Sequence, residues 1–138
     1  MNISDFTIKV LNEAGWYEGR AIDTKEIEEN LKQLGYNVFP SVQCFIKEFG
    51  NLEVKDTIND EFHSTNIKFT SYDKFGSFKN EENYAKEKLV PVGMINDNNL
   101  ILFVSETGKI YCNIGKLGDT AMEAWEMLLN AGRIELWD

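Results

Sequence analysis

The chain has 138 residues, the length of one ordinary domain, of which 43% are hydrophobic and 27% are charged. Its 23 acidic residues exceed its 14 basic ones, giving a net charge of −9; residues 1–69 hold 12 acidic and 7 basic residues, and 70–138 hold 11 and 7. This balance argues against direct binding to nucleic acid or to an anionic membrane, because both depend on lysine and arginine.

The first 50 residues are predicted to form three helices. Ser4 is placed to cap the first helix, and Asp23 with Glu26 resembles a capping box at the start of the second. Pro40 suits the first turn of the third helix, which buries an apolar side. The residues expected to end these helices are Gly15, Gly35 and Gly50.

The middle of the chain shows short extended patterns separated by polar residues. Alternation predicts half-buried strands around residues 52–54 and 67–69. The polar residues 55–66 between them are expected to form a loop or a hairpin end, with His63, the single histidine, as a solvated loop side chain. Residues 79–88 suit either a short exposed helix or an irregular turn.

The last 50 residues carry the clearest β pattern. Three strands joined by tight turns are predicted at 90–95, 100–104 and 109–114, the middle one covered on both faces. Gly115–Gly118 is interpreted as a turn before a final helix over 120–131, capped by Thr120 with Glu123 and apolar almost all round. We therefore predict one α+β domain over residues 1–138, a mostly antiparallel twisted sheet with helices at the N- and C-terminal ends.

Residues with reactive or metal-binding side chains do not form a known pattern. Cys44 and Cys112 have neither metal-ligand nor redox-pair spacing and are expected to be small buried hydrophobes in a reducing cytoplasm. Asp56, Asp60 and Glu61 lack the glycine and the spacing of a calcium loop. We therefore expect no catalytic residue, no metal and no cofactor, although a carboxylate pair in a cleft would revive an enzymatic hypothesis.

The segments that direct proteins to membranes are also not evident. The start of the chain has no basic and apolar signal-peptide pattern, and no stretch approaches the roughly 20 apolar residues of a membrane span. The expected protein is cytoplasmic, without membrane contact, and a monomer or a weak homodimer; the apolar last helix makes dimerisation possible.

The turn at Gly15–Arg20 combines large rings, two glycines and an arginine. Trp16 and Tyr17 are amphipathic, and Arg20 is one of only two arginines in the chain. Its planar guanidinium suits binding to backbone carbonyls or to a carboxylate such as Asp23. Two interpretations remain open: the turn locks the connection between helices, or it is an interaction hot spot.

The order of several motifs resembles the third family of the SUKH superfamily. The most specific motif is Ala-Gly-Trp-Tyr-Glu-Gly-Arg at 14–20, and the resemblance extends over about residues 7–131, with little to align within 55–88 beyond Phe69 and Tyr72. In order, the later matches are Phe45–Gly50 with Leu52, Leu89–Gly93, Leu100–Val104, Thr107–Tyr111 and Leu117–Asp119. The motif residues expected to shape the fold are Gly15, Trp16, Gly19, Arg20, Pro91, Gly93, Gly108, Gly118 and Asp119.

This resemblance implies an immunity protein of a bacterial polymorphic toxin system. Such a protein binds a cognate toxin domain, often a nuclease or a nucleic-acid deaminase, and its fold is expected to be α+β. An acidic protein is suited to cover the basic surface of such a toxin. The candidate toxin-binding residues are Asp56, Asp60, Glu61, Glu81, Glu82 and Asp97. The alternative is a non-catalytic binding or regulatory scaffold outside toxin conflict.

Overall fold

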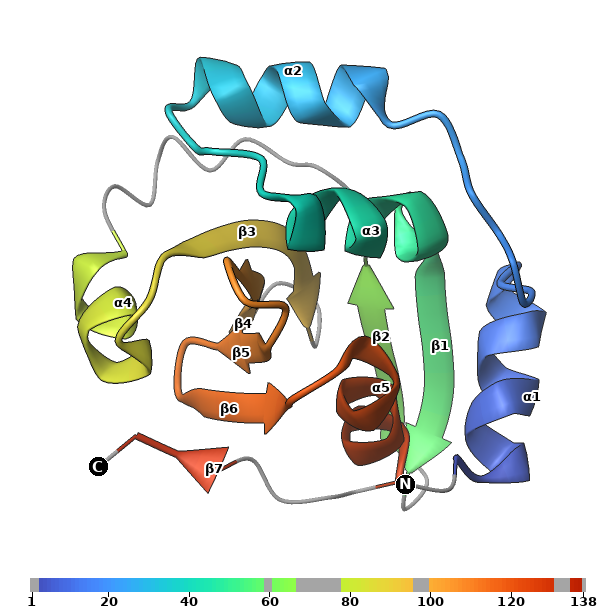
Figure 1. Cartoon of the computed structure of the whole chain (residues 1–138). Helices are drawn as coiled ribbons and strands as arrows, with labels where there is room; N and C mark the ends of the chain where they lie inside the picture. Colours follow the sequence, from blue (N-terminus) through green and yellow to red (C-terminus); the bar gives the residue numbers. More distant parts are fainter. Residues whose placement is uncertain (1–2, 59–60, 67–77, 96–99, 131–134, 138) are drawn as a thin grey trace.

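The protein folds as an α+β structure, as predicted. The computed structural model describes residues 3–58, 61–66, 78–95, 100–130 and 135–137 (Figure 1). The helices are α1 (Asp5–Ala14), α2 (Lys25–Gln33), α3 (Pro40–Phe49), α4 (Lys79–Ala85) and α5 (Ala121–Leu129). The strands are β1 (Glu53–Ile58), β2 (Glu61–Asn66), β3 (Leu89–Ile95), β4 (Leu100–Ser105), β5 (Ile110–Cys112), β6 (Gly115–Gly118) and β7 (Glu135–Leu136).

Helix ends follow the predicted capping residues, with one shift. Ser4 Oγ accepts from the backbone N–H of Thr7 at the start of α1, and α3 occupies Pro40–Phe49 as expected. The predicted capping box of α2 is wrong by one residue: Thr24 is the N-cap and makes no side-chain capping bond. The reason is that Asp23 accepts from the N–H of Lys25, in a local turn that competes with the cap.

The sheet is an antiparallel meander whose strands lie in chain order from β1 to β7 within the described residues. The predicted central strand is confirmed, because β4 pairs with β3 on one side and β5 on the other. Its side chains alternate: Leu102 and Val104 belong to the core shared with α1, α3 and α5, whereas Ile101 and Phe103 belong to a second core with Phe78. Both faces of β4 are therefore buried.

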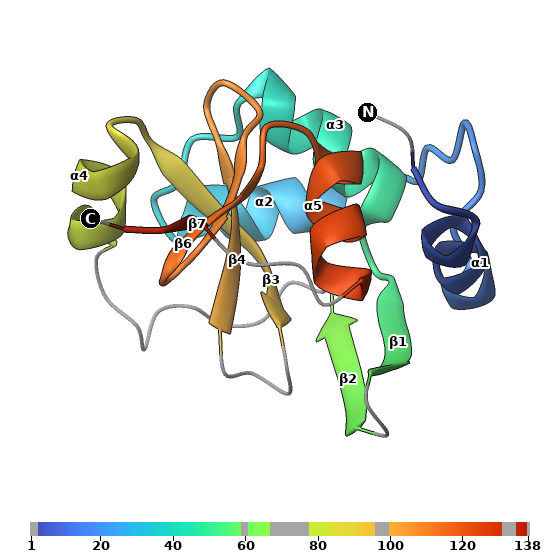
Figure 2. The same cartoon turned by 90° about the horizontal axis from the view of Figure 1, so that it is seen from below.

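The middle of the chain forms more sheet than the polar sequence indicated. Residues 55–58 and 61–66 contribute to an antiparallel hairpin (Figure 2), in which Glu53 pairs with Asn66 and Ile58 pairs with Glu61. His63 thus lies in β2, not in a loop. Backbone pairing along the whole ladder stabilises this hairpin without an apolar repeat. The predicted strand around 67–69 lies outside the described residues, and for residues 79–88 the helix alternative is the one that forms, as α4.

Gly115–Gly118 is also not the predicted turn but strand β6. It pairs with Ile110–Cys112 on one side and with β7 on the other. Two of its four residues are glycines, which show no side-chain periodicity, so the alternation typical of a strand is hidden in the sequence. The real turn is the two-residue connection between Cys112 and Gly115.

The last helix is packed against the rest of the fold, and none of its residues is exposed. Thr120 Oγ1 accepts from the N–H of Glu123, as expected of the capping box. Ala124, Trp125 and Leu129 are buried, and α5 lies against β6 and α1 and, through Trp125 and Phe49, against α3 (Figure 1). Its other apolar side chains are partly buried and pack against the same core.

The first and last helices are fastened to each other by polar contacts. The carboxylate of Glu126 in α5 accepts from the backbone N–H of Ser4 at 2.9 Å and from its hydroxyl at 3.1 Å. Asn130 donates from Nδ2 to the Thr7 hydroxyl at 2.8 Å. The pKa of Glu126 is lowered, chiefly by the hydrogen bond from the Ser4 N–H. These bonds fix the start of α1 to the end of α5.

The two cysteines differ in environment. Cys112 is buried in β5, and burial raises the pKa of its thiol. Cys44 is exposed, so the expectation of two buried cysteines is wrong for this residue. The apolar side of α3 consists of Val42, Phe45, Ile46 and Phe49, and helical spacing turns position 44 away from that side.

Candidate functional site

The motif around Trp16 fastens the turn after α1 to the C-terminal end of α3. Trp16 is buried and donates from Nε1 to the Glu48 carboxylate at 3.0 Å. Arg20 donates from Nη1 to the Glu48 carbonyl oxygen at 2.6 Å and from Nη2 to the Gly50 carbonyl oxygen at 2.9 Å. A guanidinium at the last carbonyls of a helix satisfies free acceptors and complements the helix dipole. The acceptors of the Arg20 guanidinium are therefore backbone carbonyl oxygens and not the carboxylate of Asp23.

Two further motif residues are glycines at which a side chain would interfere. Gly118 lies so close to the start of α5 that an added Cβ would be 2.7 Å from the backbone nitrogen of Ala124. Gly108 has φ +94°, a left-handed conformation that a side chain rarely adopts. Pro91 and Gly93 flank the register shift between β3 and β4, where the strand is irregular.

A cleft lies between α3, the turn from β4 to β5, and the start of α5; we call it the α3–α5 cleft. Its volume is about 340 Å³. Its floor is apolar and buried, with Phe45, Phe49, Val104 and Ile110. The remaining lining residues are Ser41, Cys44, Glu48, Thr107, Gly108, Asp119, Thr120 and Ala121. Three motif segments therefore meet at this cleft: α3, the Gly108 turn and Asp119.

The charged residues among the described lining of the α3–α5 cleft are both acidic. Glu48 is half-buried and accepts from Trp16, whereas Asp119 is exposed and pairs with Lys116. The pKa of Asp119 is lowered, first by its hydrogen bond with Lys116 and then by the charges of Lys116 and Lys109. Asp119 is therefore ionised at neutral pH.

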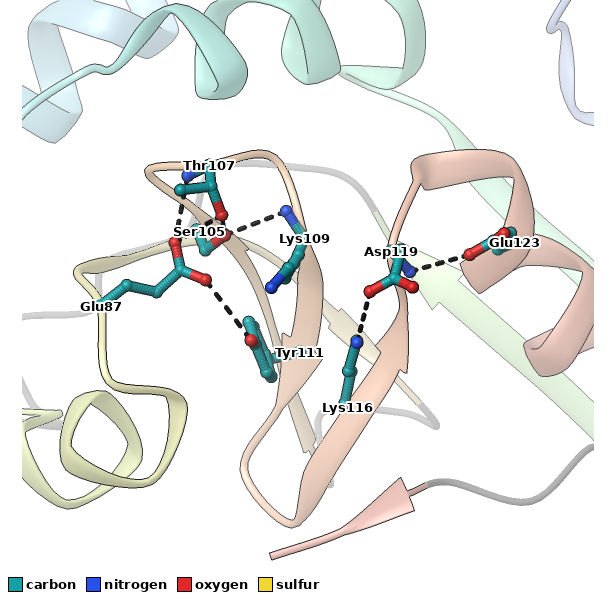
Figure 3. Close-up of polar contacts among 8 residues, drawn as sticks. All are labelled: Glu87, Ser105, Thr107, Lys109, Tyr111, Lys116, Asp119 and Glu123. Atoms are coloured by element: carbon teal, nitrogen blue, oxygen red, sulfur yellow. Dashed lines mark hydrogen bonds and ion pairs between the residues drawn. The ribbon is translucent and has the colours of Figure 1, made fainter.

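The neighbouring polar network ties the segment after α4 to the meander (Figure 3). Glu87 accepts from the N–H and the hydroxyl of Thr107 at 3.1 and 2.8 Å, and from the hydroxyl of Tyr111 at 3.4 Å. Burial is the main cause of the raised pKa of Tyr111, and the negative charge of Glu87 adds to it. The Glu87 carboxylate therefore holds the segment after α4 against the meander.

The predicted toxin-binding residues are spread over several elements. Glu81 and Glu82 lie on α4 and turn toward the meander: Glu81 accepts from Asn113 Nδ2 at 3.3 Å, and Glu82 accepts from the N–H of Leu89 at 3.0 Å. Asp56 lies in β1 and Glu61 in β2. Asp60 and Asp97 lie outside the described residues. As toxin contacts, all six stay predictions.

Sequence reasoning did not find Glu48 and Glu87. Glu48 is one acidic residue on the polar side of α3; its hydrogen-bond partner Trp16 lies 32 positions away in the chain, and Asp119, which lines the same cleft, lies 71 positions away. No local pattern in the sequence could have linked these residues.

Within the described ranges, His, Cys, Asp and Glu form no group of three or more that could hold a metal ion. None of the described helices is long and apolar enough to span a bilayer.

Comparison with known proteins identifies one family model that matches the chain. The family model described as SUKH-3 immunity protein matches residues 3–131, which is nearly the whole chain and includes every segment that contributes to the α3–α5 cleft. Searches of curated proteins and of solved structures found no match.

Proposed function

Because the chain belongs to the SUKH-3 immunity protein family, we propose that it neutralises a cognate toxin of a bacterial polymorphic toxin system by binding it one to one, without catalysis. The match of the family model over residues 3–131 carries this proposal. The protein acts as one cytoplasmic domain, as a monomer or a weak homodimer, where the toxin would reach its target.

The partner we propose is a basic toxin domain, a nuclease or a nucleic-acid deaminase. The supporting observation is the charge of −9, which is distributed over both halves of the chain. Enzymes that act on nucleic acid present basic surfaces to phosphate, and an acidic inhibitor can occupy such a surface in place of the substrate. Opposite charges also accelerate encounter, which matters for an inhibitor that must meet the toxin before the toxin acts.

A non-catalytic role agrees with how the described carboxylates are used. Glu48, Glu81, Glu82 and Glu87 all accept hydrogen bonds from other groups of the protein. Those bonds hold α4 and the turn after α1 against the rest of the fold. In this proposal the acids stabilise the surface and give it its charge, and none transfers a proton to a substrate.

The test is co-expression with the C-terminal domain of the toxin encoded by the adjacent upstream gene. We expect growth to be rescued, and we expect purified proteins to form a one-to-one complex whose association rate falls at least about tenfold between roughly 50 and 300 mM salt. A toxin that is bound with a salt-independent rate would contradict the electrostatic part of the proposal. Absence of both rescue and binding would contradict the proposed function and favour a scaffold role.

A further inference from the structure

Helix α4 depends on other elements for its position, because it has little to stabilise it on its own. The helix has seven residues, none of them is buried, and its N-cap Phe78 makes no side-chain capping bond. It ends at Lys86, whose φ of +61° lies in the left-handed region that residues other than glycine rarely adopt. Isolated helices shorter than about 12 residues are marginal in water. Contacts with the rest of the protein must therefore hold α4.

The ring of Trp137 connects α4 to the meander; we call residues 135–137 the C-terminal segment. Trp137 stacks on Tyr84 of α4, with 5.6 Å between ring centroids and 11° between ring planes, and on Tyr111 of β5 at 5.3 Å and 28°. Its backbone N–H donates to the carbonyl oxygen of Ile114 at 3.0 Å, next to the pairing of β7 with β6. Figure 2 shows α4 and β7 at the same end of the molecule. One side chain of the C-terminal segment thus contacts both α4 and the sheet.

Asn113 is a second point that α4 and the C-terminal segment share. Its carbonyl oxygen accepts from Nε1 of Trp137 at 2.9 Å, and its Nδ2 donates to the carboxylate of Glu81 in α4 at 3.3 Å. Its Oδ1 accepts from the backbone N–H of Ile101 in β4 at 2.6 Å, which fixes the residue to the sheet. Side chains that share partners in one network are coupled energetically. We therefore expect a change in the C-terminal segment to be felt in α4.

The main core of the protein does not include these two elements. Among the residues that the structure describes, the core shared by α1, α3 and α5 contains none from α4 or from the C-terminal segment. Ala85 and Trp137 are partly buried and pack against the second core, whose buried residues come from β3, β4 and β5 and from Phe78. Opening of α4 and the C-terminal segment therefore leaves the main core intact.

We propose that the C-terminal segment is a strap that closes on α4, and that the two open together as one local unit while the rest of the domain stays folded. Trp137 is the positioning residue of this unit. In the closed state Glu81 is held on Asn113, and Glu82 accepts from the N–H of Leu89 in β3. Opening releases both carboxylates from the sheet. That the strap thereby controls two toxin contacts rests on the proposed function above, whereas the strap itself does not.

Hydrogen exchange of single backbone amides in the whole protein, followed by NMR, tests the proposal. The amides of Lys86 and Trp137 report on the two parts of the unit, because each donates a backbone hydrogen bond. We expect equal free energies of opening at these two amides, unchanged by low concentrations of urea, because local opening exposes little surface. The amides of β4, which is paired on both sides, should exchange more slowly and should accelerate as urea is added.

Reciprocal substitutions test the coupling. Trp137→Ala should accelerate exchange of the Lys86 amide at least about tenfold, because it removes aromatic contacts and a hydrogen bond. Tyr84→Ala should accelerate exchange of the Trp137 amide at least about threefold, because it removes one aromatic pair. Trp137→Phe, which keeps a ring without the indole N–H, should lie between the parent protein and Trp137→Ala. The matched controls are Leu136→Ala and Asn80→Gln, which change exposed side chains of the same two elements and should alter exchange less than about twofold.

Several results would overturn the strap. These are unequal opening at the two amides, acceleration of both by urea as in β4, equal effects of Trp137→Ala and Leu136→Ala, or loss of the whole fold in Trp137→Ala. None of these measurements uses the toxin. Absence of toxin binding therefore rejects the proposed function and leaves the strap, whereas failure of the strap leaves toxin neutralisation and rejects only the control of Glu81 and Glu82.

Discussion

The guanidinium of Arg20 donates at 2.6 Å to the carbonyl oxygen of Glu48, 28 positions away in the chain. The carboxylate of the same Glu48 accepts from the indole of Trp16, so one residue of α3 binds both Trp16 and Arg20 of the turn after α1. The Trp16 ring also stacks on Phe49 at 6.4 Å between centroids. The motif with the most specific sequence therefore positions the wall of the α3–α5 cleft.

Arg20→Lys is expected to destabilise the protein by about 1.5–3 kcal/mol. Lysine keeps the charge but has no fork that can reach the carbonyls of Glu48 and Gly50 together, and hydrogen bonds to charged groups contribute about this much. Urea unfolding followed by tryptophan fluorescence measures the change, with Lys25→Arg on the exposed start of α2 as the control. Equal midpoints for Arg20→Lys and the parent protein would show that charge alone suffices.

Gly118→Ala and Gly19→Ala separate two reasons for a motif glycine. At Gly118 the added Cβ would collide with the backbone of α5, and we expect a loss of about 3 kcal/mol. At Gly19 there is open space but φ is +85°, so we expect only about 1 kcal/mol from backbone strain. Thermal or urea unfolding of both variants gives the comparison. The steric explanation fails if Gly118→Ala is the milder change.

Trp125 should tolerate phenylalanine far better than alanine. Its indole N–H is buried without a hydrogen-bond partner, and such a donor costs about 1–3 kcal/mol. Trp125→Phe removes that donor and keeps a ring against Phe49, so we expect a net change within about 1.5 kcal/mol. Trp125→Ala should cost about 3–5 kcal/mol because it leaves a cavity. Similar losses of unfolding free energy in the two variants would mean that the unpaired indole N–H does not destabilise the protein.

Stability should fall in acid partly through Glu126. Hydrogen bonds from Ser4 lower its pKa below the ordinary 4.5, so its contribution is present above pH 4.5 and is lost as the pH falls through the folded-state pKa. In Glu126→Gln this contribution is missing at every pH. The stability difference between the two proteins should therefore narrow as the pH falls from about 6 to about 3. A constant difference, measured by urea midpoints, would exclude this linkage.

The fold could be predicted where side-chain periodicity and capping residues were clear. The third helix buried the four apolar residues that its spacing indicated, and the five-residue apolar run became the central strand β4. For β1 and β2 the sequence predicted only a short strand around 52–54 and a loop or hairpin end, so the length of the polar hairpin was underestimated. For the glycine-containing β6 the predicted turn was wrong. There the ladder bonds and close packing stabilise strands that have no apolar repeat.

The cleft could not be predicted from the sequence because distant residues form it. Trp16 and Arg20 were identified by type, and backbone carbonyls were among the partners expected for Arg20. That Glu48 and Asp119 line the same cleft follows only from how α3, the meander and α5 pack together. Sequence spacing holds no information on this juxtaposition.

The order of strands in the sheet has a consequence for biosynthesis. Because each strand pairs with the one made just before it, the meander can assemble while the chain is leaving the ribosome. The hydrogen bonds between Ser4 and Glu126 are different, because they join residues 122 positions apart in the chain. The N-terminal helix is thus secured only after α5 has been made. Completion of the fold therefore waits for the synthesis of α5.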